Sequence, residues 1–142
     1  MSVNIKQNAD ASAGFQGTDG DDGPFIITDF RYTATSASIP IFIAPRRMIV
    51  KGVTVRVETA GTDVGAVTAT IVRVASGTAI ASGTALHSGT ADLKGTAATN
   101  QALALSTTST TLDIPAGTAI GVILSGVMTA ATGVIMVALA PA

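Results

Sequence analysis

The chain is 142 residues long with a net charge of -1, and 47% of its residues are hydrophobic, 12% are charged and 4% are aromatic. It contains no cysteine and one histidine, His87, so disulfides, thiolate metal sites and cysteine nucleophiles are excluded. The length fits one domain with a core large enough to fold without disulfides, and the balanced charge gives no global attraction to nucleic acid or to a membrane.

The first 24 residues predict a flexible acidic arm. Glycines fall at every third position from Gly14 to Gly23, and apart from Lys6 the charged side chains of this segment are all aspartates. Four such triplets are too few for an independent triple helix, so we expect an extended, linker-like arm. The opening residues contain no apolar stretch of signal-peptide length, and secretion by that route is not expected.

Charge is spread unevenly along the chain. Residues 1–30 have a net charge of -4, whereas residues 31–56 carry five basic and no acidic side chains. Solvated strand faces would explain this pattern, and so would contact between the acidic arm or the basic segment and another protein surface.

Residues 49–58 are the clearest strand, because apolar residues at odd positions alternate with polar residues. The odd positions hold Ile49, Val53, Val55 and Val57. In the next strand, 67–74, Arg73 shares the parity of apolar residues. Either a bulge shifts the register there, or Arg73 lies at the exposed end of the strand.

The rest of the chain also has the composition and rhythm of strands. The further candidates are 25–32, 38–43, 79–86, 101–105, 110–114, 118–125 and 133–140. Clusters of Gly, Pro, Ser and Asn separate them at short spacing, and no glycine-free window shows the apolar period of a helix. About nine strands of this kind predict an antiparallel β-sandwich or barrel over residues 25–142.

Two regions are repetitive or unusually apolar. SGTA occurs three times and is followed by KGTA within residues 76–99, which we interpret as a short hairpin followed by a low-complexity loop. The last two strands, 118–125 and 133–140, are apolar on both faces and therefore need a layer covering the face away from the core. A loop of the same chain could supply it, and so could a subunit interface, which we favour.

No group of residues predicts a catalytic, cofactor-binding or metal site. His87 precedes Ser88 and lies five residues before Asp92, but no GxSxG motif accompanies them. We therefore expect a solvent-exposed loop histidine. The carboxylates are scattered over strand ends and turns without a pair suited to acid–base catalysis. The protein is predicted not to be an enzyme and to use no cofactor.

All five aromatic residues lie within residues 15–42. Phe25, Phe30 and Phe42 could fill one end of the core, or they could anchor a contact with another chain. The chain has no tryptophan and one tyrosine, Tyr32, which argues against a sugar-binding site built on stacked rings.

Three segments carry a resemblance to a known class of proteins: IPIFIAPRRMIVKGVTVRVETAGTDVGAVTATIVRV, ATNQALALSTTSTTLDIPAGTAIGVILSG and ATGVIMVALAPA. Within them, LDIPAGTAIGVIL has a turn of PAG type leading into a strand, then a short loop and a final apolar strand. From Ile39 onward this succession resembles small jelly-roll proteins of tailed bacteriophages, particularly capsid decoration or cement proteins. The resemblance implies an all-β, antiparallel jelly-roll β-sandwich of about eight to nine strands over residues 25–142, preceded by the arm.

The resemblance also implies a non-enzymatic structural protein of the virion, made in the host cytoplasm. Such a protein binds the outer surface of the major capsid protein lattice and stabilises the head, as a homo-oligomer in which a trimer is favoured over a dimer. A receptor- or carbohydrate-binding jelly roll of a tail fibre, baseplate or spore coat is the alternative. No nucleic acid or membrane partner is expected. The candidate contact residues are Phe15, Phe25, Arg31, Tyr32, Phe42, Arg46 and Arg47.

Overall fold

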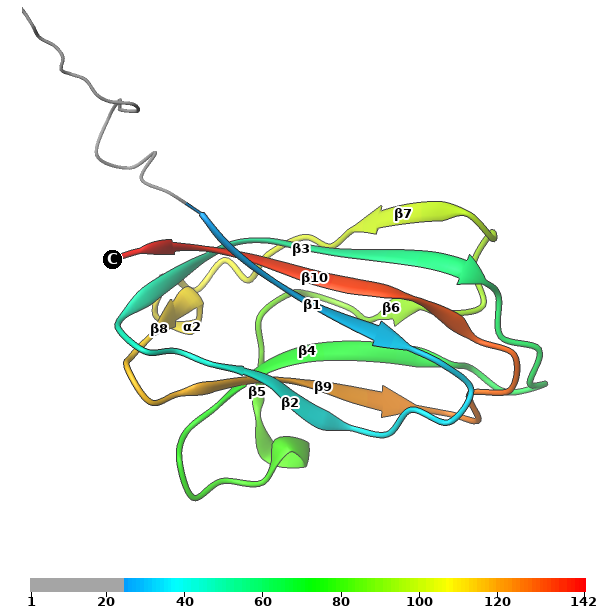
Figure 1. The fold of residues 1–142 in the computed structure, drawn as a ribbon, viewed down its shortest axis with the longest axis horizontal. Helices are drawn as coiled ribbons and strands as arrows, with labels where there is room; N and C mark the ends of the chain where they lie inside the picture. Colours follow the sequence, from blue (N-terminus) through cyan, green and yellow to red (C-terminus); the bar gives the residue numbers. More distant parts are fainter. Residues whose placement is uncertain (1–24) are drawn as a thin grey trace, which may run out of the picture.

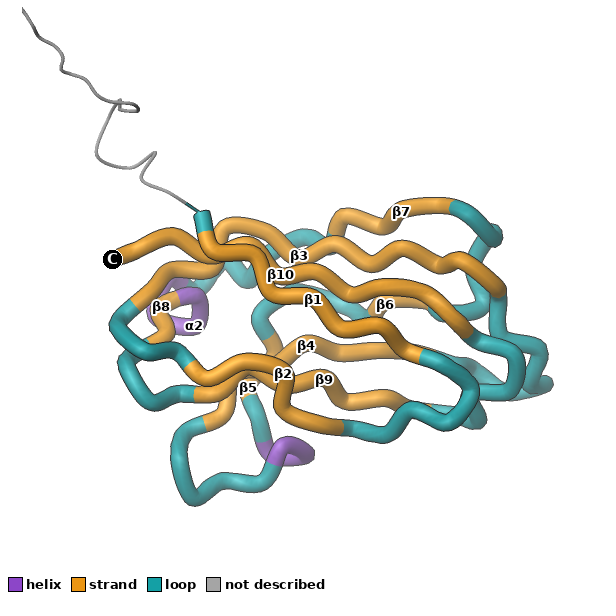
Figure 2. The backbone as a smooth tube through the Cα atoms, viewed as in Figure 1, coloured by secondary structure: helices purple, strands orange, loops and turns teal. Residues whose placement is uncertain are grey.

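The computed structural model describes residues 25–142, and their regular structure is almost entirely β (Figures 1 and 2). The strands in this range are β1 (Ile26–Tyr32), β2 (Ile39–Ile43), β3 (Met48–Thr59), β4 (Thr68–Val74), β5 (Thr84–Ala85), β6 (Ala91–Asp92), β7 (Thr99–Ala102), β8 (Asp113–Ile114), β9 (Ala119–Ser125) and β10 (Thr132–Pro141). A 3-10 helix, η3 (Ile80–Ser82), and a short helix, α2 (Ser109–Leu112), lie in the connections. The predicted arm and Phe15 lie outside the described residues.

The strands form two five-stranded antiparallel sheets that pack as a sandwich. One sheet has the order β1-β10-β3-β7, with β8 also paired to β3, and the other has the order β2-β9-β4-β5, with β6 also paired to β4. The short strands β7 and β8 both pair with β3, and the short strands β5 and β6 both pair with β4. Each of these two pairs occupies the place of one interrupted strand at the edge of its sheet. If β5 with β6, and β7 with β8, are each counted as one strand, the sandwich has eight strands, and the chain then changes sheets at every connection except the one after β4. This order confirms the predicted antiparallel jelly roll.

β3 is the longest strand and contains a bulge. Its register with β10 shifts at Lys51, which has no partner residue. Before the bulge Met48 and Val50 are buried, and after it the buried residues are the odd-numbered valines up to Val57. The extra residue reverses which parity faces the core. Ile49 therefore lies outside the core, which corrects the prediction that it shares a face with those valines.

β4 pairs with β9 over seven residues without a register shift. A bulge therefore does not explain why Arg73 shares the parity of apolar residues. Arg73 is the second-to-last residue of the strand, which confirms the alternative of a position at the strand end, although the residue is half-buried rather than exposed.

Two predicted strands form other structure. Residues 79–86 form η3 and the two-residue strand β5, and residues 110–114 form α2 and the two-residue strand β8. The SGTA repeat does not form a hairpin of its own, because β5 and β6 each pair with β4 and not with each other. Small residues in these segments offer little apolar surface, so their conformation follows the elements on which they pack.

The segment 75–83 covers part of the apolar outer face of β9. A Cβ atom added at Gly121 would lie 2.7 Å from Cδ1 of Ile80, so η3 is packed directly on this strand. The same chain therefore supplies the covering layer at Gly121, as the alternative prediction of a covering loop had it, and over the rest of the outer face the subunit interface stays a prediction. On β10 the outward residues Val134, Met136 and Ala138 are half-buried.

The core lies between the two sheets and consists mainly of aliphatic side chains. The largest fully buried ones include Tyr32, Met48, Ile71, Leu86, Leu93, Ile114, Ile120, Ile135 and Leu139. Removing apolar surface from water contributes about 25 cal/mol per Å² and is the main stabilising term in a chain without cysteine. None of the helices in residues 25–142 has the length and apolar character needed to cross a bilayer.

Candidate protein-binding surfaces

The side of the sandwich formed by β1 and β2, here called the open side, carries most of the exposed large apolar residues. β1 and β2 are the outermost strands of their sheets and contact each other. Five of the seven large apolar residues exposed within residues 25–142 belong to these strands or directly precede β1: Phe25, Ile26, Ile27, Ile39 and Ile43. Exposed apolar side chains along free strand edges are typical of contact surfaces.

The contact residues predicted from the sequence divide into an exposed and a buried group. Phe25 is 56% exposed, and Arg31 and Arg46 are exposed too. Phe42 is half-buried against the core. Tyr32 is 1% exposed and belongs to the core, which corrects its assignment to a contact surface.

Tyr32 is buried because the residue opposite it in β10 is Gly133. A Cβ atom at Gly133 would lie 2.5 Å from the Tyr32 hydroxyl oxygen and would clash with the carbonyl oxygen of Arg56, so the ring occupies the space that a side chain would need. The hydroxyl donates a hydrogen bond to that carbonyl oxygen at 3.5 Å. Burial raises the pKa of Tyr32 to about 12.

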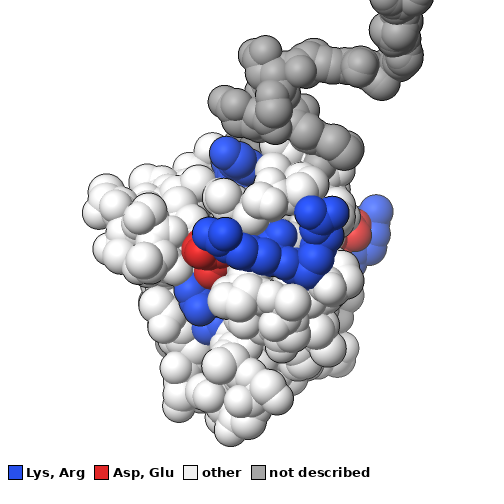
Figure 3. All heavy atoms as spheres, turned by 90° about the vertical axis from the view of Figure 1, so that its left-hand side faces the viewer, with Lys and Arg blue, Asp and Glu red and all other residues white. Residues whose placement is uncertain are grey.

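One end of the sandwich, here called the basic end, gathers Lys and Arg side chains (Figure 3). They come from the connection between β2 and β3, from β3 itself and from the end of β4: Arg46, Arg47, Lys51 and Arg73. Residues 25–142 carry seven basic and five acidic side chains in all. Because four of the seven basic residues gather here, this end is the most positive part of the described surface.

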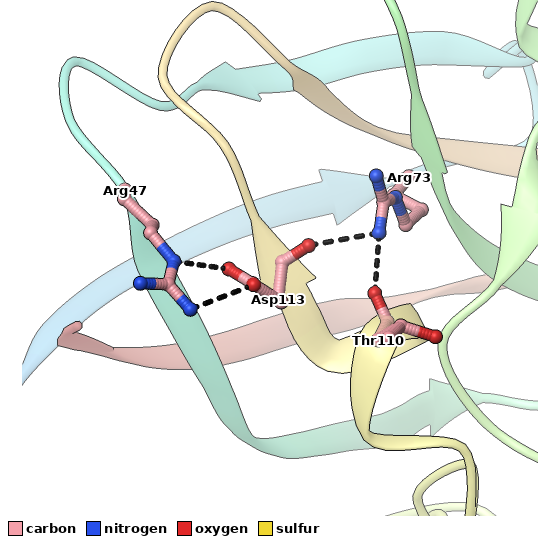
Figure 4. A network of polar contacts seen from close by, with 4 residues as sticks. All are labelled: Arg47, Arg73, Thr110 and Asp113. Atoms are coloured by element: carbon pink, nitrogen blue, oxygen red, sulfur yellow. Dashed lines mark hydrogen bonds and ion pairs between the residues drawn. The ribbon is translucent and has the colours of Figure 1, made fainter.

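Asp113 of β8 accepts hydrogen bonds from two of these side chains, Arg47 and Arg73 (Figure 4). Nε and Nη2 of Arg47 donate to the two carboxylate oxygens of Asp113, both at 2.9 Å. These hydrogen bonds hold the pKa of Asp113 below its usual value and raise the pKa of Arg47. Nη1 of Arg73 donates to the carbonyl oxygens of Thr110 at 2.6 Å and Asp113 at 2.8 Å. Arg73 thereby joins β4 to α2 and β8 at the base of the basic end.

Arg46 and Lys51 are the available charges of the basic end. Both are exposed, and the ion pairs found in residues 25–142 are Arg47 with Asp113 and Arg56 with Glu58. Neither Arg46 nor Lys51 is therefore neutralised by a described carboxylate. The prediction had named Arg46 but not Lys51, which is exposed because it is the bulged residue of β3.

The opposite side of the sandwich, here called the closed side, is joined by backbone pairing. His87 and Leu105 form a bridge between the connection β5–β6 of one sheet and the connection β7–β8 of the other. The amide of Ser88 donates to the carbonyl oxygen of Ala104 at 2.9 Å. These contacts tie the two sheets together along this edge.

His87 is 4% exposed, which corrects the prediction of a solvent-exposed loop histidine. The amide of Ile71 donates to its Nε2 at 2.9 Å, and Nδ1 lies 3.3 Å from the carbonyl oxygen of Ser88. This geometry fits a neutral ring with its proton on Nδ1, and burial lowers the pKa of His87. Asp92 is not among its hydrogen-bond partners and accepts a hydrogen bond from the amide of Lys94. His87 thus accepts a hydrogen bond from the backbone of β4.

The described part of the chain shows no cluster of three His, Cys, Asp or Glu residues that could hold a metal ion.

Edge-strand isoleucines are the contact candidates that sequence reasoning missed. Ile27 is 52% and Ile43 is 66% exposed. Alternation indicates which residues share a face, but it does not indicate which strand ends a sheet.

No protein-family model and no curated protein matches this chain. Similar solved structures include a chain of the cyanophage Pam1 capsid asymmetric unit, with 19% identity, 96% coverage of both chains and a TM-score of 0.44. A Bacillus endospore appendage, from a family of disulfide-linked pili, has 15% identity, 94% coverage of this chain and 96% of that chain, and a TM-score of 0.38. A chain of infectious bursal disease virus, Gx strain, has 18% identity, 82% and 32% coverage, and a TM-score of 0.38. Similarity at this level carries no argument about function.

Proposed function

We propose that the protein is a non-enzymatic virion component that binds the outer surface of a major capsid lattice and stabilises the phage head. The observation that carries this proposal is the basic end, where Arg46 and Lys51 present positive charge without a described ion-pair partner. The jelly-roll fold and the resemblance of the sequence from Ile39 onward to decoration proteins support it.

The basic end suits contact with an acidic protein surface. Exposed charges at the rim of an interface speed association and select a partner of opposite sign, and salt screens them. Hydrogen bonds hold the base of this surface in place, because Arg47 donates to both carboxylate oxygens of Asp113 and Arg73 donates to two backbone carbonyl oxygens. A rigid module present in several copies gains affinity for a repeating lattice through effective concentration.

Co-sedimentation with undecorated heads of the same virus tests the proposal. We expect the protein to sediment with the heads at low salt and to be released as the ionic strength rises. Arg46→Glu should weaken binding by about tenfold, because it reverses a charge at the contact. Its thermal transition should match that of the unaltered protein, since Arg46 is exposed and forms no described ion pair.

The matched control is Lys94→Glu, which makes the same change of charge away from the basic end. Lys94 follows β6 and donates to the carbonyl oxygen of Gly65 at 3.0 Å. This variant should bind heads as the unaltered protein does. Equal loss of binding in both variants, or binding that salt does not change, would contradict the proposal. Binding to a glycan array with no affinity for heads would favour the receptor-binding alternative.

A further inference from the structure

Within residues 25–142, β1 and β2 each have one unpaired edge, and the two edges differ in how readily they can pair with another strand. β2 contains Pro40, which has no amide hydrogen, and its register with β9 shifts between Pro40 and Phe42. β1 contains no proline and pairs with β10 over all seven of its residues without a shift. Prolines and bulges are the usual protection of an edge strand. β1 is therefore the edge that offers a regular row of backbone groups.

The side chains of β1 have opposite charges placed symmetrically about one residue. Asp29 and Arg31 are exposed on the outer face and flank Phe30, which faces the core and is half-buried. Within residues 25–142, neither Asp29 nor Arg31 forms an ion pair. A strand with this order of charges is complementary to a second copy of itself in the antiparallel direction.

The charges select one register for such a pair. Residues directly opposite each other in antiparallel strands lie on the same face, so a twofold axis relating two copies of β1 must pass midway between the two copies of one residue. An axis at Phe30 places each Asp29 opposite Arg31 of the other copy. An axis at Asp29 or at Arg31 would place two like charges directly opposite each other, which is unfavourable.

We propose that β1 pairs antiparallel with β1 of a second copy, with the twofold axis at Phe30, so that two sandwiches share one continuous sheet. The outer face of the joint then has two Asp29–Arg31 ion pairs, and the core-facing side has the two Phe30 rings opposite each other. Ile39 and Ile43 of β2 lie on the same side of the sandwich and become covered by the second copy.

This interface has a consequence for the number of subunits. A twofold contact uses the same surface on both chains, so two copies satisfy it completely and a third has no free β1 edge to join. The interface therefore implies a dimer, whereas the sequence had favoured a trimer. It does not depend on the proposed function, and its test contains no phage heads, so either proposal can fail without the other.

Charge exchange on β1 tests the register. Light scattering at micromolar concentration should give a mass of two chains for the unaltered protein. Asp29→Arg places Arg opposite Arg, and Arg31→Asp places Asp opposite Asp. For each variant alone, the dissociation constant of the dimer should therefore rise by about tenfold or more. An equimolar mixture of the two variants should recover the dimer, because each Arg then faces an Asp. The double variant should also recover it.

A cysteine cross-link tests the axis directly, because the chain has no cysteine of its own. In the proposed dimer two copies of Phe30→Cys lie opposite each other and should form a disulfide under mild oxidation. The matched control is Thr28→Cys, whose two copies are offset by four residues, or about 13 Å. A disulfide needs Cβ atoms within about 4.5 Å, so the control should stay unlinked.

Several outcomes would overturn the proposal. The unaltered protein could have the mass of one or of three chains, or the mixture of charge variants could fail to recover the dimer. Linking of Thr28→Cys in preference to Phe30→Cys would also exclude this axis. If Phe30→Cys does not fold, the charge variants still decide the matter, since Asp29 and Arg31 are exposed.

Discussion

The closed and open sides of the sandwich differ in whether backbone hydrogen bonds join the two sheets. On the closed side, backbone bonds around His87 and Leu105 join the two sheets, and His87 at the junction is buried while Leu105 is half-buried. On the open side, β1 and β2 are outermost strands, and Ile43 is 66% exposed. Backbone groups paired within the chain stabilise the fold, whereas backbone groups left at an edge can bind another chain. We therefore expect substitutions on the closed side to change stability and those on the open side to change association.

The largest effect on stability is expected at His87. In His87→Ala the buried amide of Ile71 loses its acceptor and a cavity replaces the ring, which should lower the free energy of unfolding by about 2–3 kcal/mol. Denaturant unfolding measures this change. His87→Gln, which retains a side-chain acceptor, should lose clearly less. Equal losses in the two variants would show that the hydrogen bond to Ile71 does not matter.

Acidification should weaken the closed side in the same way. Burial holds the pKa of His87 in the folded protein below its ordinary value of 6.5. Below about pH 6.5, His87 therefore binds a proton in the unfolded chain while it stays neutral in the folded chain. The contribution of His87 to the free energy of unfolding is complete above that pH and is lost as the pH falls. Unfolding measured at pH 7 and pH 5 should show a larger loss for the unaltered protein than for His87→Gln. A parallel loss in both would assign the effect to other groups.

The smallest effect on stability is expected on the open side. Ile43→Ser replaces an exposed side chain, so the free energy of unfolding of the dilute protein should change by less than about 0.5 kcal/mol. The same denaturant measurement checks this value. A loss comparable to that of His87→Ala would mean that the open side already contributes to the core of the single chain.

Much of the fold could be predicted from the sequence because it depends on local alternation. The strands at 25–32, 38–43, 118–125 and 133–140 lie where the pattern placed them, to within a residue or two. The segment 79–86 was predicted wrongly because small residues have no strong preference of their own. Its conformation depends on packing against β4 and β9, which are distant in the sequence.

The candidate surfaces could be predicted only in part. The charge imbalance pointed to Arg46 and Arg47, and both lie at the basic end. The pairing of Arg47 with Asp113 joins residues 66 positions apart, and nothing in the local pattern indicates it. The exposure of Lys51 depends on a bulge whose register is set by β10.

The amino-acid sequence by itself determined an all-β chain with an interior of aliphatic residues and no cysteine chemistry, because composition and period-two alternation act on each strand separately. Only the tertiary structure decided that His87 is buried, that η3 covers β9 and that β1 is left at an edge. These outcomes depend on which strands become neighbours. Such contacts between distant segments leave no regular trace along the chain.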